Sequence, residues 1–253
     1  MLFLVFLALF VTMLALAVAG HRLGQRRLAG ETDQERVGMV AVETAIFGLM
    51  GLIFAFTYAG AAQRFEQRRA YTIQEANAIG TVYLRIDLVA EGARPALRAK
   101  VKRYAQSLLS AYGALPDEEG FARGLGQVRA LQDEIWSDAV AALRDASPAA
   151  NQLLIPALND MFDLNVTHEA LVRVKTPDAI LATLVILAFL CSLLAGNGLA
   201  GTRPWSHFLH KAGFAIVVTG IIYIVVDYDH PRFGLIRLDF TDRVLEQTIA
   251  GMK

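Results

Sequence analysis

The chain contains four segments in which apolar residues follow one another almost without interruption: residues 1–20, 38–62, 179–196 and 212–226. The sequence has 24 lysines and arginines and 24 aspartates and glutamates, and of these only Glu43 lies within the four segments. A soluble domain mixes charged and apolar residues along each amphipathic element, so this segregation is not typical of one. About 20 helical residues cross the hydrocarbon core of a bilayer. The pattern therefore predicts four transmembrane helices.

The first apolar segment is predicted to be a retained helix and not a cleaved signal peptide. A signal peptide places its basic residues before a short apolar run and ends at a small-residue cleavage site. Here the basic residues Arg22, Arg26 and Arg27 follow the run, and the run is long enough to span a bilayer.

The region from Gln63 to Lys175 is charged and rich in residues that favour helices. No stretch in it alternates polar and apolar residues with a period of two, so we expect no strand. Apolar residues recur at helical spacing along residues 64–90, namely at Ala76, Ile79, Tyr83, Ile86 and Ala90. Nothing between residues 60 and 66 would end a helix, so we expect the second span to continue as one rod of up to about 50 residues.

Prolines divide the rest of this region into three further helices, predicted at residues 96–113, from the turn at Pro116 to about residue 146, and at about 149–172. The predicted fold class is an all-α membrane protein with four transmembrane helices and a helical extramembrane domain inserted between the second and third spans. We divide the chain into residues 1–62 (spans one and two), 63–178 (the extramembrane domain), 179–228 (spans three and four) and 229–253 (a C-terminal tail that packs on the domain).

Composition excludes several classes of function. Equal numbers of basic and acidic residues give no net charge, so we expect no nucleic-acid partner. The one cysteine, Cys191, excludes a disulfide framework. The sequence lacks the common nucleotide, zinc-protease and CxxC motifs, and His207 and His210 have no third ligand nearby. We predict no enzyme, no cofactor and no metal site. Basic residues near the span ends are nearly balanced between the two sides, so the positive-inside rule leaves the orientation open.

Two features of the second span are candidates for function. Glu43 is an ionisable residue within an apolar segment, and such residues are often functional, although Glu43 could also reach the interface or pair with Lys211. Leu49, Leu52 and Phe56 form one bulky apolar face, which suits helix packing, lipid contact or a pore.

Six polar residues are expected to form a structural lock between the long helix and the segment after the fourth span: Glu75, Asn77, Arg85, Asp227, Asp229 and Arg232. We expect Glu75, Asn77 and Arg85 to be buried. Because an unpaired buried guanidinium is costly, Arg85 should pair with Asp227 or Asp229. A calcium site would need six to eight oxygen ligands, and only two carboxylates lie close together here.

Three stretches of the sequence resemble the bestrophin-like family of bacterial membrane proteins: residues 51–69, 75–85 and 227–234. The order of two spans, a helical insertion and two spans is also similar to that of true bestrophins. In both, an apolar second span ends in a phenylalanine that is followed by an arginine eight residues later, here Phe56 and Arg64.

The resemblance implies a homopentameric ion channel in the bacterial inner membrane, whose second span lines the pore and forms a neck near Leu49, Leu52 and Phe56. Its partners would be further copies of the chain, the lipid bilayer and inorganic ions. The acidic calcium-binding run of animal bestrophins is missing, and Leu52 stands where a second aromatic residue is found. Calcium gating is therefore not expected.

Ion selectivity is left open, because the chain offers charges of both signs. Rings of Glu43 would favour cations, whereas rings of Arg64 and Arg68 would favour anions. A second function is also open: a membrane-anchored helical interaction or sensor protein that conducts no ions, in which the spans serve only as anchors.

Overall fold

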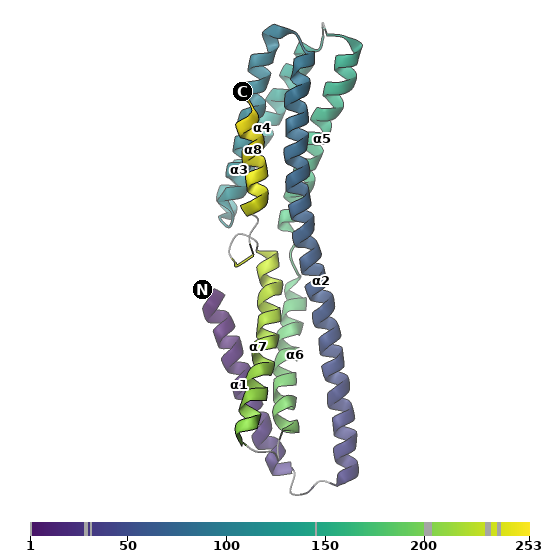
Figure 1. Cartoon of the computed structure of the whole chain (residues 1–253), viewed down its shortest axis with the longest axis vertical. Coiled ribbons are helices and arrows are strands. Elements are labelled where there is room, and N and C mark those ends of the chain that lie inside the picture. The colour runs from purple at the N-terminus through teal and green to yellow at the C-terminus, as the bar shows by residue number, and fades with distance from the viewer. Residues whose placement is uncertain are drawn as a thin grey trace. The chain divides into compact units, whose positions relative to one another are not determined.

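The computed structural model of the chain describes residues 2–27, 30, 32–144, 146–199, 204–230, 234–236 and 239–253, without the side chains of residues 2, 33, 36, 204–207 and 239–241. Every regular element in these ranges is a helix (Figure 1). The α-helices are α1 (Leu2–Arg27), α2 (Asp33–Arg85), α3 (Arg94–Ala114), α4 (Glu118–Ala142), α5 (Pro148–Arg173), α6 (Asp178–Gly198), α7 (Pro204–Asp229) and α8 (Asp239–Gly251). Two short 3₁₀ turns, η1 (Ile86–Leu88) and η2 (Glu91–Ala93), lie between α2 and α3.

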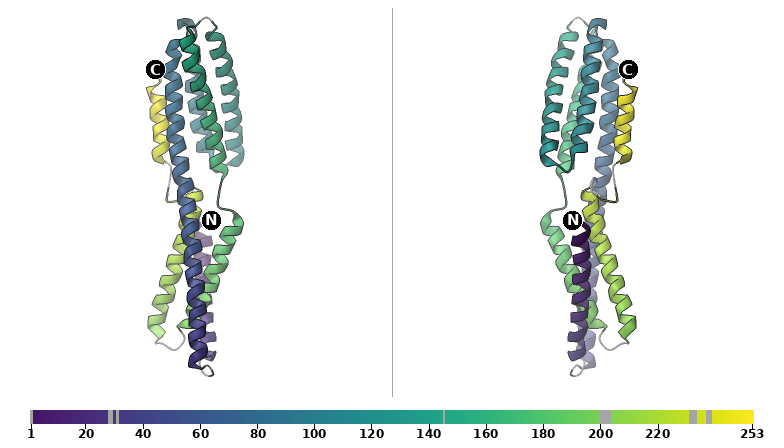
Figure 2. Two further views of the ribbon diagram at one scale, coloured as in Figure 1. Left: turned by 90° about the vertical axis from the view of Figure 1, so that its right-hand side faces the viewer. Right: turned by 90° about the vertical axis from the view of Figure 1, so that its left-hand side faces the viewer.

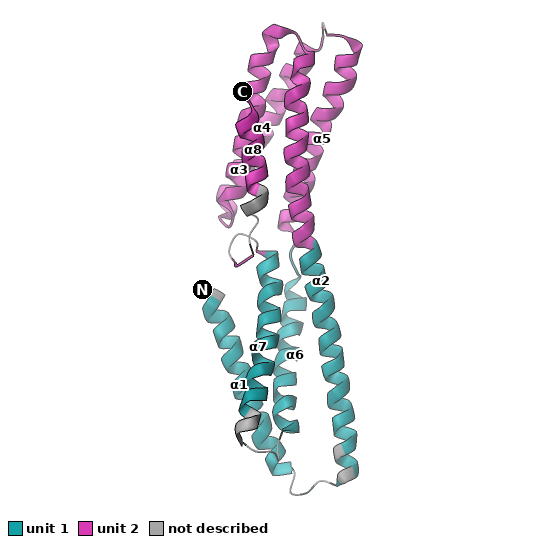
Figure 3. Ribbon diagram, in the orientation of Figure 1, with its two compact units in different colours: residues 1–63, 175–229 teal, residues 64–174, 230–253 magenta. Residues whose placement is uncertain are grey.

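The chain forms two compact units, which Figure 3 colours separately. Unit 1 comprises residues 1–63 and 175–229, and unit 2 comprises residues 64–174 and 230–253. Helix α2 contributes its first part to unit 1 and its second part to unit 2.

Four helical stretches among the described residues are long and apolar enough to cross a membrane: Phe3–Arg27, Val37–Leu88, Pro148–Gly198 and Phe208–Asp229. The third of these takes in both α5 and α6, and its uninterrupted apolar run lies in α6. Each stretch covers one of the apolar segments read from the sequence, the first of them from residue 3 onward. The prediction of four candidate spans is therefore confirmed.

Helices α1 and α6 of unit 1 cross at very short range because glycines lie at the crossing. A Cβ atom placed on Gly20 would lie 1.9 Å from the carbonyl oxygen of Leu193, and one on Gly196 would lie 2.0 Å from the carbonyl oxygen of Ala17. No side chain fits at either position without moving a backbone. Small residues at helix contacts are the usual way in which helices associate in lipid, where apolar burial gives little driving force.

Helix α2 has 53 residues and is continuous, as the absence of a breaker predicted. It begins at Asp33, five residues before the predicted apolar segment. The cause is a capping box: the Thr32 backbone N–H donates to Oε2 of Glu35 at 2.9 Å, and the Glu35 N–H donates to the Thr32 hydroxyl oxygen at 3.4 Å.

Unit 2 is a helical bundle in which the second part of α2 runs beside α3, α4 and α5 (Figures 1 and 2). Capping side chains start two of its helices: Asp117 accepts from the Glu119 N–H at the start of α4, and Ser147 from the Ala150 N–H at the start of α5. The core of the bundle is built from large apolar side chains such as Ile79, which is completely buried. The C-terminal helix α8 packs on α3 within the same unit.

Candidate functional site

Eleven residues on one side of α2 are exposed, and they run from the apolar first part of this helix to its polar second part. They follow one another at spacings of three and four: Ala45, Leu49, Leu52, Phe56, Ala59, Gln63, Gln67, Ala70, Gln74, Asn77 and Thr81. At 3.6 residues per turn this spacing keeps a residue on one side of a helix. We call these eleven residues the exposed face of α2.

The three predicted neck residues lie together on this face. The exposed fraction is 52% for Leu49, 53% for Leu52 and 70% for Phe56. In contrast, Phe54 and Ala61, on the other side of the helix, are buried at 4% and 0%. Large apolar side chains that stay exposed in a single chain indicate contact with lipid or with another protein surface.

The predicted pore charges do not lie on the exposed face. Glu43 is partly buried on another side of α2, where its Oε1 accepts a hydrogen bond from Nδ2 of Asn197 on α6 at 3.1 Å. Arg68 is only 2% exposed, and its guanidinium donates to the carbonyl oxygens of Leu171 and Val174. Arg64 is partly buried. The reason for the position of Arg68 is the end of α5, whose last carbonyl groups have no partner within their own helix.

Asn77 corrects a prediction, because it is exposed and not buried. It follows Ala76 directly and precedes Ile79 by two residues, and both of these lie in the core. One residue along a helix is a rotation of about 100°, so a neighbour of a buried residue can face outward. The spacing places Asn77 on the exposed face instead.

Glu75 lies in the interior of unit 2, with an exposed fraction of 1%. Its Oε2 is 2.8 Å from Nδ1 of His168, and its Oε1 accepts a hydrogen bond from Nδ2 of Asn165 at 3.1 Å. The chain of contacts continues on α4, because Nε2 of Gln132 donates to Oδ1 of Asn165 at 3.1 Å. The ring of Tyr112 lies over that of His168, with centroids 4.4 Å apart.

The buried carboxylate also affects two tyrosines of α3. Burial raises the pKa of Tyr104, and the negative charge of Glu75 raises it further. The pKa of Tyr112 is raised by the same two causes in the same order. Both hydroxyl groups are therefore neutral at physiological pH.

The partners of Glu75 were missed in the sequence, although a signal was present. Along α5, the buried positions recur at helical spacing through Leu154, Leu158 and Met161 and then reach Asn165 and His168. Two polar residues on an otherwise apolar face require a polar partner inside the core. The helical spacing along α5 would have indicated that Asn165 and His168 share a buried polar cluster. It would not have indicated that Glu75 is the carboxylate that they bind.

The other members of the predicted lock have separate partners. Arg85 donates from Nη1 to the carbonyl oxygen of Leu153 at 2.7 Å, so a backbone oxygen takes the place of the acid that we expected. Asp229 at the end of α7 accepts hydrogen bonds from the backbone N–H and the hydroxyl of Thr176, just before α6 begins. Asp227 is buried with an exposed fraction of 1%. Arg232 lies outside the described residues.

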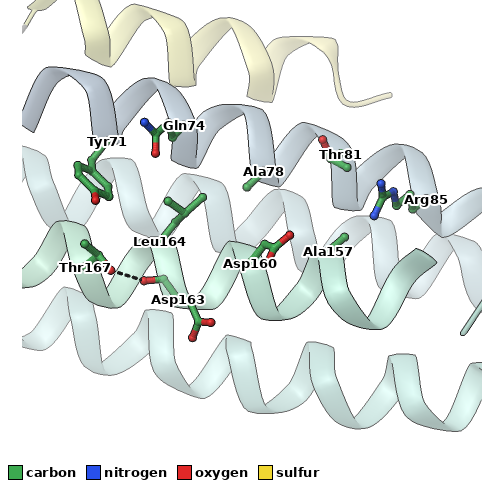
Figure 4. A pocket seen from close by; sticks show the side chains of 10 residues that line it. All are labelled: Tyr71, Gln74, Ala78, Thr81, Arg85, Ala157, Asp160, Asp163, Leu164 and Thr167. Atoms are coloured by element: carbon green, nitrogen blue, oxygen red, sulfur yellow. Dashed lines mark hydrogen bonds between the residues drawn. The ribbon is translucent and has the colours of Figure 1, made fainter. Parts of the chain in front are cut away.

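A groove of about 480 Å³ lies between α2 and α5 in unit 2 (Figure 4). Its walls are mixed in charge, with Arg85 from α2 and with Asp160 and Asp163 from α5. Gln74 and Thr81 of the exposed face also line it. A second groove, of about 850 Å³, lies beside Glu43 in unit 1 and has mostly apolar walls from α2 and α6.

Comparison with known families bears directly on this architecture. The family model of the bestrophin-like domain matches residues 11–239, which is nearly the whole chain. The chain belongs to the bestrophin-like family. The resemblance read from the sequence is thereby confirmed. No curated protein matched the chain.

Solved structures support the bestrophin fold for this bestrophin-like chain. A bacterial bestrophin homolog from Klebsiella pneumoniae is 15% identical and matches with a TM-score of 0.72, over 96% of this chain and 97% of that one. Two point variants of that homolog match with TM-scores of 0.74 and 0.73, each at 15% identity and over 97% of the homolog's chain. With its four apolar helical stretches, the bestrophin-like chain is a multi-pass membrane protein.

Proposed function

We propose that the protein is an ion channel of the bacterial inner membrane, formed by a ring of identical chains. Five copies would surround the pore, with α2 of each copy nearest the axis. The domain predicted at residues 63–178, together with the tail 229–253, contains unit 2 and would form the extramembrane part. Family membership supports this proposal, but one observation of the chain itself carries it: the exposed face of α2.

The apolar part of that face has the chemistry of a hydrophobic gate. Leu49, Leu52 and Phe56 are at least half exposed, and they lie within two helical turns. Repeated around an axis, such side chains form a narrow apolar ring from which water is easily lost, and ions do not pass a dry constriction. We therefore place the neck of the pore at these three residues.

The continuation of the same face is suited to a water-filled pathway. Beyond Ala59 the face carries Gln63, Gln67, Gln74 and Asn77, all exposed. Any helix surface outside a membrane meets water, so this polar row fits a wide vestibule beyond the neck without requiring one. The case for a pore over lipid contact therefore comes from family membership together with the apolar residues of the neck.

The test is the ion flux of the reconstituted protein, with the mass of the native oligomer measured first. We expect a homo-oligomer that conducts ions in liposomes. Phe56→Ala should raise the flux severalfold, because a smaller side chain widens and wets the neck. Phe3→Ala is the matched control: Phe3 on α1 is also exposed, and its loss should leave the flux unchanged.

Two results would contradict the proposal. Equal flux through an active wild type and Phe56→Ala would remove Phe56 from the neck. A pure monomer without flux would favour the second function, a membrane-anchored interaction protein. The polar groove between α2 and α5 would then be the first place to look for its partner.

A further inference from the structure

One side of α1 is exposed along the helix and changes from apolar to cationic toward the end of the span. It carries residues that follow one another at spacings of three and four: Leu4, Ala8, Val11, Ala15, Val18, Arg22 and Arg26. At about 100° per residue, these seven positions lie within about 40° on either side of one line. Helix α1 packs on α6 and α7 with its other sides. We call the seven residues the outer face of α1.

The apolar part of the outer face is suited to contact with an acyl chain. The exposed fraction is 65% for Leu4, 54% for Val11 and 44% for Val18, and the helix is one of the candidate membrane spans. The hydrocarbon of one bilayer leaflet is about 15 Å deep, which corresponds to about ten helical residues. Counted back from Arg22, that length reaches almost to Val11. Apolar residues of the outer face therefore line the depth of the leaflet.

The two arginines that end the outer face are exposed, and the chain provides no counterion for them. Among the described residues, neither Arg22 nor Arg26 makes a hydrogen bond or an ion pair through its side chain. No aspartate or glutamate precedes Glu31 in the sequence. Residues four apart on a helix are neighbours, with Cβ atoms about 5–6 Å apart, so both guanidinium groups can reach one oxyanion. A guanidinium binds a phosphate through two parallel hydrogen bonds.

The adjacent Arg27 shows that this arrangement belongs to one side of the helix. Arg27 is turned toward α2, where its Nη2 donates to Sδ of Met39 at 3.0 Å. It lines the groove whose walls also carry Glu35 and Glu43. Two carboxylates repel an anion, so that groove is not suited to a phosphate. Only the outer face combines cationic side chains with an apolar surface and no acid.

We infer that the outer face of α1 binds an anionic phospholipid, with an acyl chain along Val11 to Val18 and the phosphate between Arg22 and Arg26. A zwitterionic phospholipid offers the same phosphate, but its ammonium group would lie near two guanidinium groups and be repelled by them. A lipid of net negative charge is therefore preferred. This inference rests on α1 as a membrane span and not on the proposed pore.

The test is native mass spectrometry of the full chain in detergent, titrated with phosphatidylglycerol or with phosphatidylcholine. We expect the wild type to retain phosphatidylglycerol at the lower lipid concentration. Arg22→Gln combined with Arg26→Gln should weaken its binding about thirtyfold, because each basic residue at a membrane surface adds to the attraction of an anionic lipid. Retention of phosphatidylcholine should change little.

The matched control is Arg103→Gln combined with Arg144→Gln, which removes the same charge from exposed positions of unit 2. This variant should bind phosphatidylglycerol as the wild type does. A third arm adds inorganic phosphate at the concentration of the lipid. It should not displace phosphatidylglycerol, because free phosphate makes no contact with the apolar part of the face.

Three results would overturn the inference. The first is equal retention of the two lipids by the wild type, which would mean that the arginines do not select for charge. The second is undiminished binding of phosphatidylglycerol when Arg22 and Arg26 are both replaced. The third is displacement of the lipid by inorganic phosphate, which would make this a phosphate site and not a lipid site. The first and third results need only the wild type, so the test does not depend on the folding of a variant.

Discussion

The two units of the chain pack their helices in different ways. In unit 1 a small apolar core around Met13 and Phe54 is joined by a very close helix crossing at Gly20 and Gly196, and large apolar side chains such as Phe56 point outward. In unit 2, large apolar side chains fill the interior, and a polar cluster around Glu75 lies among them.

The difference is the one expected if unit 1 lies in lipid and unit 2 in water, as proposed above. Burial of apolar surface stabilises a bundle in water, and it leaves room for a few polar groups only if these are fully hydrogen-bonded. In lipid the same burial gives little, so close packing at small residues has to provide the contact. Under that proposal one helix, α2, would satisfy both conditions, and its buried and exposed residues change character along its length.

The largest effect should come from the polar cluster of unit 2. Glu75→Ala removes the carboxylate and leaves His168 and Asn165 without their acceptor inside the core. Leaving a buried polar group without its partner costs about 1–3 kcal/mol, and here two such groups lose theirs. Chemical unfolding of the purified protein, followed by circular dichroism, measures this loss.

The control for that variant is Glu66→Ala, since Glu66 lies on the same helix but is exposed. It should leave the unfolding curve unchanged. If Glu75→Ala were as stable as Glu66→Ala, the cluster would not stabilise unit 2, and the contrast between the two units would rest on apolar packing alone.

A smaller loss is expected at the helix crossing of unit 1. In Gly196→Ala the new methyl group would meet the Ala17 carbonyl oxygen, so α1 and α6 must separate. Overpacking of this kind costs typically about 1–3 kcal/mol. Thermal unfolding in detergent should show a lower midpoint than for Gly220→Ala, a glycine of α7 with open space around it. Equal midpoints for the two variants would mean that the crossing can relax without cost.

Most of the fold could be predicted from the sequence, because long apolar runs and helical spacing are local signals. The four candidate spans and the continuous α2 were predicted in this way. The start of α2 at Asp33 was missed, although the pair Thr32 and Glu35 has the spacing of a capping box.

The candidate site was harder to predict, because its contacts join residues far apart in the chain. Glu75 meets His168 across 93 positions, and Arg85 meets the backbone of Leu153 across 68. Composition cannot distinguish a guanidinium that binds a carboxylate from one that binds a carbonyl oxygen. Asn77 was misplaced for a different reason: Ala76 and Ile79 close to it in the sequence are buried, and the rotation of the helix turns Asn77 away from them.

The smallest effect concerns the tyrosines beside Glu75, and it should be seen only at high pH. Because burial raises the pKa of Tyr104 in the folded chain, the unfolded chain, with a tyrosine pKa of about 10, loses its proton first. The contribution of Tyr104 to stability is therefore complete below pH ~10 and is lost as the pH rises above it.

Tyr104→Phe has no proton to lose, so its stability should fall less steeply above pH ~10 than that of the wild type, while the two stay similar at neutral pH. Unfolding curves recorded at a series of pH values give both slopes. Tyr112→Phe should act in the same direction, because the pKa of Tyr112 is raised by the same two causes. If both variants lost stability with pH as steeply as the wild type, these hydroxyl groups would have to be reached by water in the folded chain. The interior of unit 2 would then be less dry than its polar cluster requires.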